Sequence, residues 1–201
     1  MLFRSNMPNT EECHYGVMGY KYTPYNFFKK IFNSDPERGI FDSNDQRSIE
    51  LMNRFVKKMI QSGSDIKKYV DRRNEIERVS VGFPFTINDT TTGKIYKCFA
   101  MNIHSNSLAF GDLYDQYDIV CPFIFIEGRQ WKHSLFTHDP ENIDCSYIAK
   151  WLGTYDGLGG GGHAGAAGFQ TYHNILAKDC EIELSISKFR KNPKINIKYK
   201  E

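Results

Sequence analysis

The sequence predicts an α/β fold, a mixed sheet with flanking helices preceded by a helical segment and a connector helix. Three observations carry this prediction. Apolar residues recur at helical spacing up to about residue 78, and after it they alternate with polar residues or fall in short apolar runs. A dense cluster of glycines and alanines follows at residues 157–169. We therefore expect a helical part at 1–63, a connector helix at 64–78 and an α/β domain at 79–201.

The N-terminal third is expected to contain two helices that are separated at Gly63. Ser43 and Gln46 have the spacing of a capping box, which predicts a helix start. Gly63 favours a helix end, and a second helix follows from about Ser64. Its thin apolar stripe and charged outer face are typical of a connector between two globular parts. The apolar face of the first helix is formed by Ile49, Met52, Phe55, Val56, Met59 and Ile60.

Beyond the connector, the period of the pattern changes from that of a helix to that of a strand. Apolar and polar residues alternate from Val79 to Ile87, which predicts a half-buried strand. In the strand expected at 119–126, Pro122 indicates a sheet edge or a bulge. Asp144 is expected to cap a helix whose inward face carries Ile148 and Leu152. The remaining expected elements are a turn at 88–94, strands at 95–103 and 131–137, and a short helix at 107–114.

Composition and charge exclude several classes of protein. The chain has 201 residues with 26 Lys+Arg and 24 Asp+Glu, so bulk charge gives no argument for nucleic-acid binding. No apolar run approaches the ~18 residues of a membrane span, and the N-terminus has no signal-peptide core. The five cysteines are an odd number without a CxxC pair, which favours free thiols. We therefore expect a cytoplasmic protein that does not bind membranes.

The glycine cluster is the strongest functional feature. Four consecutive glycines, Gly159 to Gly162, can adopt positive φ angles and direct backbone N–H groups toward one point. The alanines that follow favour a helix starting there, and a helix N-terminus attracts anions. His163 lies at the junction, where a bound phosphate would hold it as a hydrogen-bond donor. The pattern thus predicts a phosphate or carboxylate site with a histidine clamp.

Two other interpretations of the cluster remain open. A glycine-rich stretch is often only a flexible loop, although a linker has no need of the alanines. Gly157, Gly159 and Gly162 also form a literal GxGxxG, the pattern of dinucleotide-binding loops. That pattern requires a strand immediately before it, whereas residues 144–152 are expected to be helical.

The segment GGGGHAGAAGF closely resembles the GGGH-x-x-AAG signature of the DHH-associated domain, the C-terminal substrate-binding domain of DHH phosphoesterases. This family includes RecJ-like exonucleases, nanoRNases and cyclic-dinucleotide phosphodiesterases. Asp144 to Ala149 is similar to the family's helix before the glycines, and residues 131–137 fall where it has a strand ending in S-l-R-S. Asn102 and Ser107 match an Asn and a Ser often found after the domain's first strands. One departure is Phe136, which occupies the place of the arginine.

The resemblance implies a function in binding substrate. It implies that Gly159, Gly160, Gly161, Gly162 and His163, with Asn102 and Ser107, bind a nucleotide or short single-stranded nucleic acid through its phosphate. Phosphoester hydrolysis in the family resembles two-metal chemistry with Mn²⁺, held in an N-terminal domain that carries an Asp-His-His triplet. The sequence contains no such triplet, so we assign no catalytic or metal-binding residues.

These observations leave three functional hypotheses. In the first, the chain is the C-terminal portion of a DHH phosphoesterase, in which residues 1–63 are the end of a catalytic domain that is otherwise missing or separate. In the second, it is a stand-alone, non-catalytic nucleotide-binding module. The third is the C-terminal domain of alanyl-tRNA synthetases, which has a similar glycine motif, but the expected upstream His/Cys zinc pattern is absent.

The other clusters give weaker signals. The basic C-terminal tail, with alternating Ile195, Ile197 and Tyr199, predicts a solvated edge strand or a strand that follows a nucleic-acid backbone. The pair His138–Asp139 is expected to form a turn or cap. Four aromatic residues could stack on bases, although a role in the core is the commoner case: Phe110, Tyr114, Trp131 and Phe169.

Overall fold

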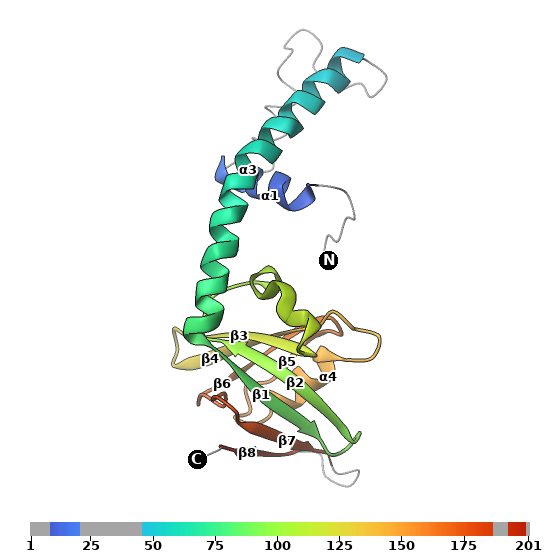
Figure 1. Cartoon of the computed structure of the whole chain (residues 1–201). Coiled ribbons are helices and arrows are strands. Elements are labelled where there is room, and N and C mark those ends of the chain that lie inside the picture. The colour runs from blue at the N-terminus through green and yellow to red at the C-terminus, as the bar shows by residue number, and fades with distance from the viewer. Residues whose placement is uncertain (1–8, 21–45, 187–192, 200–201) are drawn as a thin grey trace. The chain divides into compact units, whose positions relative to one another are not determined.

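The computed structural model describes residues 9–20, 46–186 and 193–199. It confirms the α/β class, with a mixed, curled eight-stranded sheet and four helices in those residues (Figure 1). The chain divides into two compact units, Met1–Arg73 and Asn74–Glu201. The elements are α1 Thr10–Gly19, α3 Gln46–Val81, β1 Gly82–Asp89, β2 Lys94–Met101, the 3₁₀ segment η1 Ser107–Asp115, β3 Ile119–Ile126, β4 Gln130–Phe136, α4 Cys145–Leu152, β5 Gly160–His163, β6 Ala166–Thr171, β7 Glu181–Ser185 and β8 Lys194–Lys198.

In the first unit, α1 packs against α3 at a contact between two glycines. A Cβ atom on Gly63 would overlap the carbonyl oxygen of Glu12, and one on Gly16 would overlap the carbonyl oxygen of Met59. The expected helix break at Gly63 is therefore wrong, because this glycine permits close helix packing inside an unbroken helix. The expected cap, Ser43, lies outside the described residues.

The helix also extends further than the alternating pattern predicts. The expected strand forms, but its expected start at Val79 is wrong, because α3 continues to Val81 and leaves the Val79 side chain 85% exposed. The strand begins at Gly82, where a Cβ atom would lie 2.5 Å from the ring of Phe99. Glycine at this position lets the chain leave the helix close against β2.

In the described part of the chain, no helix is long and apolar enough to cross a membrane.

The eight strands form one sheet in the order β5-β6-β4-β3-β2-β1-β7-β8. The pairs β1–β7 and β2–β3 are parallel, and the other neighbours are antiparallel. Pro122 was expected at an edge or a bulge, but β3 lies inside the sheet and keeps one register from Val120 opposite Phe136 to Phe123 opposite His133. Its pairing with β2 ends at Pro122, which suits a residue without an N–H group.

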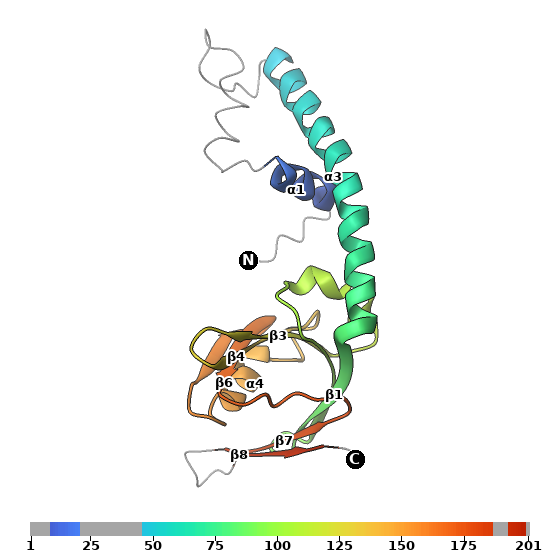
Figure 2. The same cartoon turned by 90° about the vertical axis from the view of Figure 1, so that its left-hand side faces the viewer.

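Helix α4 forms as the sequence predicts and fills the inside of the curled sheet (Figure 2). Asp144 caps it by accepting hydrogen bonds from the backbone N–H groups of Ser146 and Tyr147, at 2.9 and 3.1 Å. A further hydrogen bond from the Ser146 hydroxyl lowers the pKa of the Asp144 carboxyl. Ile148 and Leu152 are buried in the core, as expected. The inner face of the sheet therefore packs on α4.

His133 of β4 is a fully buried histidine in this inner core. Its Nε2 lies 2.9 Å from the hydroxyl oxygen of Thr171, and that hydroxyl donates its only proton to the carbonyl oxygen of His173 at 2.7 Å. Nε2 must therefore carry the imidazole proton and donate it to Thr171. Nδ1 is buried without a partner, and the ring stacks on Phe169 with the centroids 4.5 Å apart. Burial lowers the pKa of His133 to about 3.

This neutral histidine predicts lower stability in acid. The unfolded chain takes up a proton near pH ~6.5, whereas the folded chain does so only near pH 3. The contribution of neutral His133 to the free energy of unfolding is therefore fully present above pH ~6.5. It is lost as the pH falls, by about 2 kcal/mol between pH 7 and pH 5. Urea unfolding at several pH values measures this dependence. His133→Phe should flatten the curve and exposed His104→Ala should not; an unchanged curve for His133→Phe would contradict the assignment.

Candidate functional site

The glycine cluster forms a β-hairpin. Gly160–His163 is β5, and Ala166–Thr171 is β6, antiparallel to it. The expected helix after the glycines is therefore wrong, and with it the expected phosphate site at a helix N-terminus. The signal that sequence reasoning missed is the period of two in β6, where Ala167, Phe169 and Thr171 are buried and the residues between them are not.

Several glycines in or beside the cluster are required by close packing. A Cβ atom on Gly160 would overlap the carbonyl oxygen of Ala149 at the end of α4, and one on Gly153 would overlap Gly159. A Cβ atom on Gly162 would lie 2.6 Å from the Cα of Ala167. The contacts of Gly160 and Gly153 fix the start of β5 against the helix, and that of Gly162 fixes β5 against β6.

Three glycines of the cluster instead face open space: Gly157, Gly159 and Gly161. Gly159 has a φ of 82° and Gly161 a φ of 158°, and a Cβ atom on either would meet nothing within 4 Å. A ligand can therefore approach the backbone of Gly161 without hindrance. The cluster thus divides into glycines required by packing and glycines that leave backbone accessible.

The strand register places Gly161 and His163 on one face of the sheet. His163 lies opposite Ala166, Ala166 lies opposite Phe136 on β4, and Phe136 lies opposite Val120. Val120 belongs to the apolar cluster beneath η1, on the side of the sheet away from α4. We call this side of β4, β6 and β5 the outer face; it consists of Lys132, Ser134, Phe136, Ala166, Gly168, Gln170, Gly161 and His163.

The outer face is accessible, whereas the opposite face is not. On β4, His133 and Leu135 are buried, while Ser134 is half-exposed and Lys132 is exposed. His163 is exposed on β5. The face therefore offers small side chains and accessible backbone, with a histidine at one corner and a lysine at another.

The remaining two predicted site residues, Asn102 and Ser107, lie outside the glycine hairpin. Asn102 follows the end of β2 and is exposed, and Ser107 begins η1, where its carbonyl oxygen accepts a hydrogen bond from Tyr114 at 3.3 Å. Strands β3, β4 and β6 separate β2 from β5, so these strands are four spacings apart, ~19 Å along the sheet. The structure brings together the glycines and His163, and Asn102 lies at the end of a strand four positions from them. Ser107 lies on η1, which packs on the outer side of the sheet against Val120 and Phe136.

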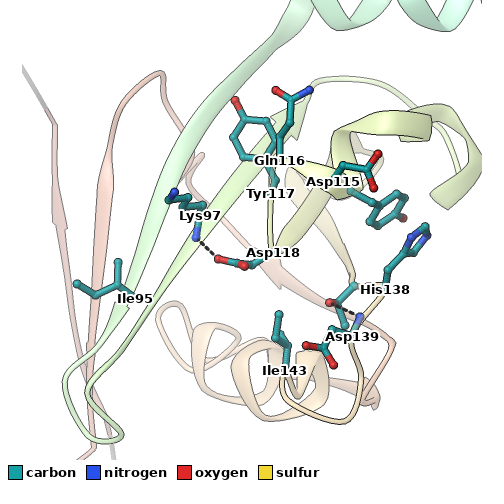
Figure 3. Close-up of a pocket in the computed structure, with 11 residues that line it drawn as sticks. Ile95, Lys97, Asp115, Gln116, Tyr117, Asp118, His138, Asp139 and Ile143 are labelled. Atoms are coloured by element: carbon teal, nitrogen blue, oxygen red, sulfur yellow. Dashed lines mark hydrogen bonds between the residues drawn. The ribbon is translucent and has the colours of Figure 1, made fainter.

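A separate cavity of about 400 Å³ lies between β2, the end of η1 and the segment after β4 (Figure 3). Its lining includes the carboxylates of Asp115, Asp118 and Asp139. Asp118 accepts a hydrogen bond from the backbone N–H of Lys97 at 2.7 Å, and Asp139 accepts one from the backbone N–H of Asn142 at 3.3 Å, so it caps a turn. Three carboxylates repel phosphate, so this cavity does not suit an anion.

The aromatic residues divide between core and surface. Phe110 and Phe169 are buried in the core, and Trp131 is partly buried against Phe123. Tyr114 stacks on His138, with the ring centroids 3.4 Å apart. His133 and His138 are therefore held by different partners, one inside the core and the other beside the acidic cavity.

The basic tail and the cysteines take structural places. β8 is an edge strand, as expected, and Lys198 forms ion pairs with Glu183 at 2.8 Å and Glu181 at 3.6 Å. These carboxylates oppose a role for Lys198 in binding a nucleic-acid backbone. The basic residues Lys188, Arg190, Lys191 and Lys200 lie outside the described residues.

Four of the five free cysteines are buried, and burial raises the pKa of each thiol: Cys98, Cys121, Cys145 and Cys180.

Comparisons with known proteins do not assign the chain to a family. No protein-family model matches the chain, and no curated protein matches it at a significant level. The resemblance of the glycine motif to the DHH-associated domain therefore stays a prediction.

Substitutions of the packed Gly160 and the exposed His163 are predicted to have different effects on stability. Gly160→Ala should destabilise the protein by about 1–3 kcal/mol, because its methyl group has no room between Ala149 and Phe169. His163→Ala should change stability by less than about 0.5 kcal/mol, because the side chain is exposed. Urea unfolding of both variants checks this, and equal stabilities for Gly160→Ala and the wild type would show that the hairpin is not packed on α4.

Proposed function

We propose that this chain is the substrate-binding portion of a DHH-type phosphoesterase and that its outer face binds a phosphate group of a nucleotide or short single-stranded nucleic acid. Two observations support the proposal: the GGGH-x-x-AAG motif, and the exposure of Gly161 and His163 on one face of the hairpin. The second observation carries it, because close packing explains other glycines of the motif but explains neither of these residues.

The chemistry of this corner suits a phosphate. A histidine ring can donate a hydrogen bond to a phosphate oxygen, and a charge-assisted bond of this kind is about twice as strong as a neutral one. Among the described strands, β5 ends the sheet and pairs with β6 alone, so backbone on its other side can be approached by a ligand. Gly161 keeps that approach open because it has no side chain.

The residues of this chain are assigned to binding and orientation. Among the described residues, no group of three or more His, Cys, Asp or Glu side chains is arranged to hold a metal ion. We therefore derive no step through a metal. We propose that a separate or N-terminal catalytic domain provides the metal ions and activates water.

The histidine can be tested directly. His163→Ala should weaken the binding of adenosine 5′-monophosphate by about tenfold, which corresponds to the loss of one charge-assisted hydrogen bond of ~1.4 kcal/mol. Isothermal titration calorimetry on the full chain measures the affinity. His173→Ala is the matched control, because His173 is also exposed but lies beyond the end of β6. Equal affinities for wild type and His163→Ala would reject the site.

The second candidate function is that of a stand-alone nucleotide-binding module. It predicts the same binding of nucleotides, but it does not predict a part in phosphoester hydrolysis. Under both hypotheses, the purified chain with Mn²⁺ should release no detectable mononucleotide from a short oligoribonucleotide. Adding a candidate catalytic partner should restore hydrolysis only if the chain belongs to a phosphoesterase. Chromatographic analysis of the products measures both outcomes. Robust hydrolysis by this chain alone would contradict the assignment of its residues to binding.

A further inference from the structure

The acidic cavity beside η1 has no part in the proposed function, although its size is that of a ligand site. Its volume of about 400 Å³ lies within the range of ~300–1,000 Å³ that is typical of pockets for small molecules. Its walls come from β2, from the end of η1 with the loop that follows, and from the segment between β4 and α4. All of these belong to the second compact unit, so the cavity is formed within one folded body.

The charge of the lining points to a cation. The carboxylates of Asp115, Asp118 and Asp139 stand against the ammonium group of Lys97, and they come from three different segments of the chain (Figure 3). Within the part of the chain that the structure describes, none of the three forms an ion pair. Carboxylates that converge on one cavity without neutralising partners attract a positively charged ligand.

Structural roles explain two of these carboxylates but not the third. Asp118 accepts a hydrogen bond from the backbone N–H of Lys97 at 2.7 Å, and Asp139 accepts one from the side-chain amide of Asn142 at 2.9 Å. The carboxylate of Asp115, at the end of η1, accepts no hydrogen bond from the described residues. Its charge is therefore available to a ligand.

The rest of the lining favours an organic cation over a metal ion. In the described residues, no group of three or more His, Cys, Asp or Glu side chains is arranged to hold a metal ion. Apolar side chains also line the cavity: Ile143, which is buried, and Ile95, which is 64% exposed. Methylene groups of a ligand can cover them and thereby remove apolar surface from water. Tyr117 adds an aromatic ring, whose face attracts organic cations.

We propose that this cavity binds a small aliphatic polyamine. Its ammonium groups contact the carboxylates of Asp115 and Asp118, and its methylene groups cover the two isoleucines of the lining. A ligand with several ammonium groups matches a cavity in which the carboxylates lie on separate segments. The cavity shares no residue with the outer face, so binding here is independent of the proposed function.

Isothermal titration calorimetry of the full chain with spermidine tests the site. The wild type should bind spermidine, and added salt should weaken the binding because it screens the attraction between charges near the surface. The diol 1,8-octanediol, an uncharged chain of similar length, should not bind detectably. An equal concentration of Mg²⁺ should leave most of the spermidine bound, because the ion cannot cover the apolar part of the lining.

Substitutions that remove one charge each locate the binding. Asp115→Asn should weaken spermidine binding by about threefold to tenfold, because one charge-assisted contact is lost. Asp118→Asn should have an effect of the same size, since asparagine can still accept the hydrogen bond from Lys97. Glu141→Gln is the matched control and should bind as the wild type does, because it makes the same change of charge at an exposed residue outside the lining.

The outcomes decide the proposal in either direction. A loss confined to the two lining variants supports the polyamine site. Equal losses in all three variants would show that the general negative charge of this region attracts spermidine and would overturn the site. Unchanged affinity in both lining variants, no binding by the wild type, or full displacement by Mg²⁺ would also overturn it.

A measurement on the wild type keeps the proposal testable if a variant does not fold. Mapping ¹H–¹⁵N chemical-shift changes during a titration with spermidine should show the largest changes at residues 115–118 and 137–139. Changes centred on another part of the domain would overturn the proposal.

Discussion

The close approach of α4 to the glycine hairpin is the constraint on which the rest of this domain depends. The end of the helix and the start of β5 touch through backbone atoms, and a single methyl group on Gly160 or Gly153 would separate them. This contact holds β5 at the end of the curled sheet and thereby fixes the position of His163. The same helix fills the inside of the sheet, so the side chains of β4 and β6 that point away from it remain accessible.

The arrangement of charge separates two surfaces that could otherwise compete as the candidate site. The cavity beside η1 has a volume of about 400 Å³, but its three carboxylates oppose the binding of an anion. The outer face is open, and exposed His163 and Lys132 mark two of its corners. A ligand with phosphate groups therefore has a physical reason to prefer the outer face.

Sequence reasoning predicted the elements whose signals are local. The capped helix α4 follows from a cap residue and the strand β3 from an apolar run, and both formed. The short helix expected at 107–114 also formed, as η1. It failed where a glycine has a tertiary role. Gly63 resembles a helix stop but makes room for α1, and Gly160 resembles part of a phosphate loop but makes room for α4. The role of such a glycine depends on the residue that packs against it, and the sequence alone does not identify that residue.

The central claim is that the outer face of β4, β5 and β6 binds the ligand. The most direct test is a titration of the full chain with the 5′-phosphorylated dinucleotide pApA, in which ¹H–¹⁵N chemical-shift changes are mapped onto the structure. We predict the largest changes at the backbone amides of Gly161, His163, Gly168 and Ser134, with small changes at Ile148 and Leu152 inside the curl. Changes centred instead on residues 114–118 beside the acidic cavity, or no changes at saturating pApA, would contradict this account.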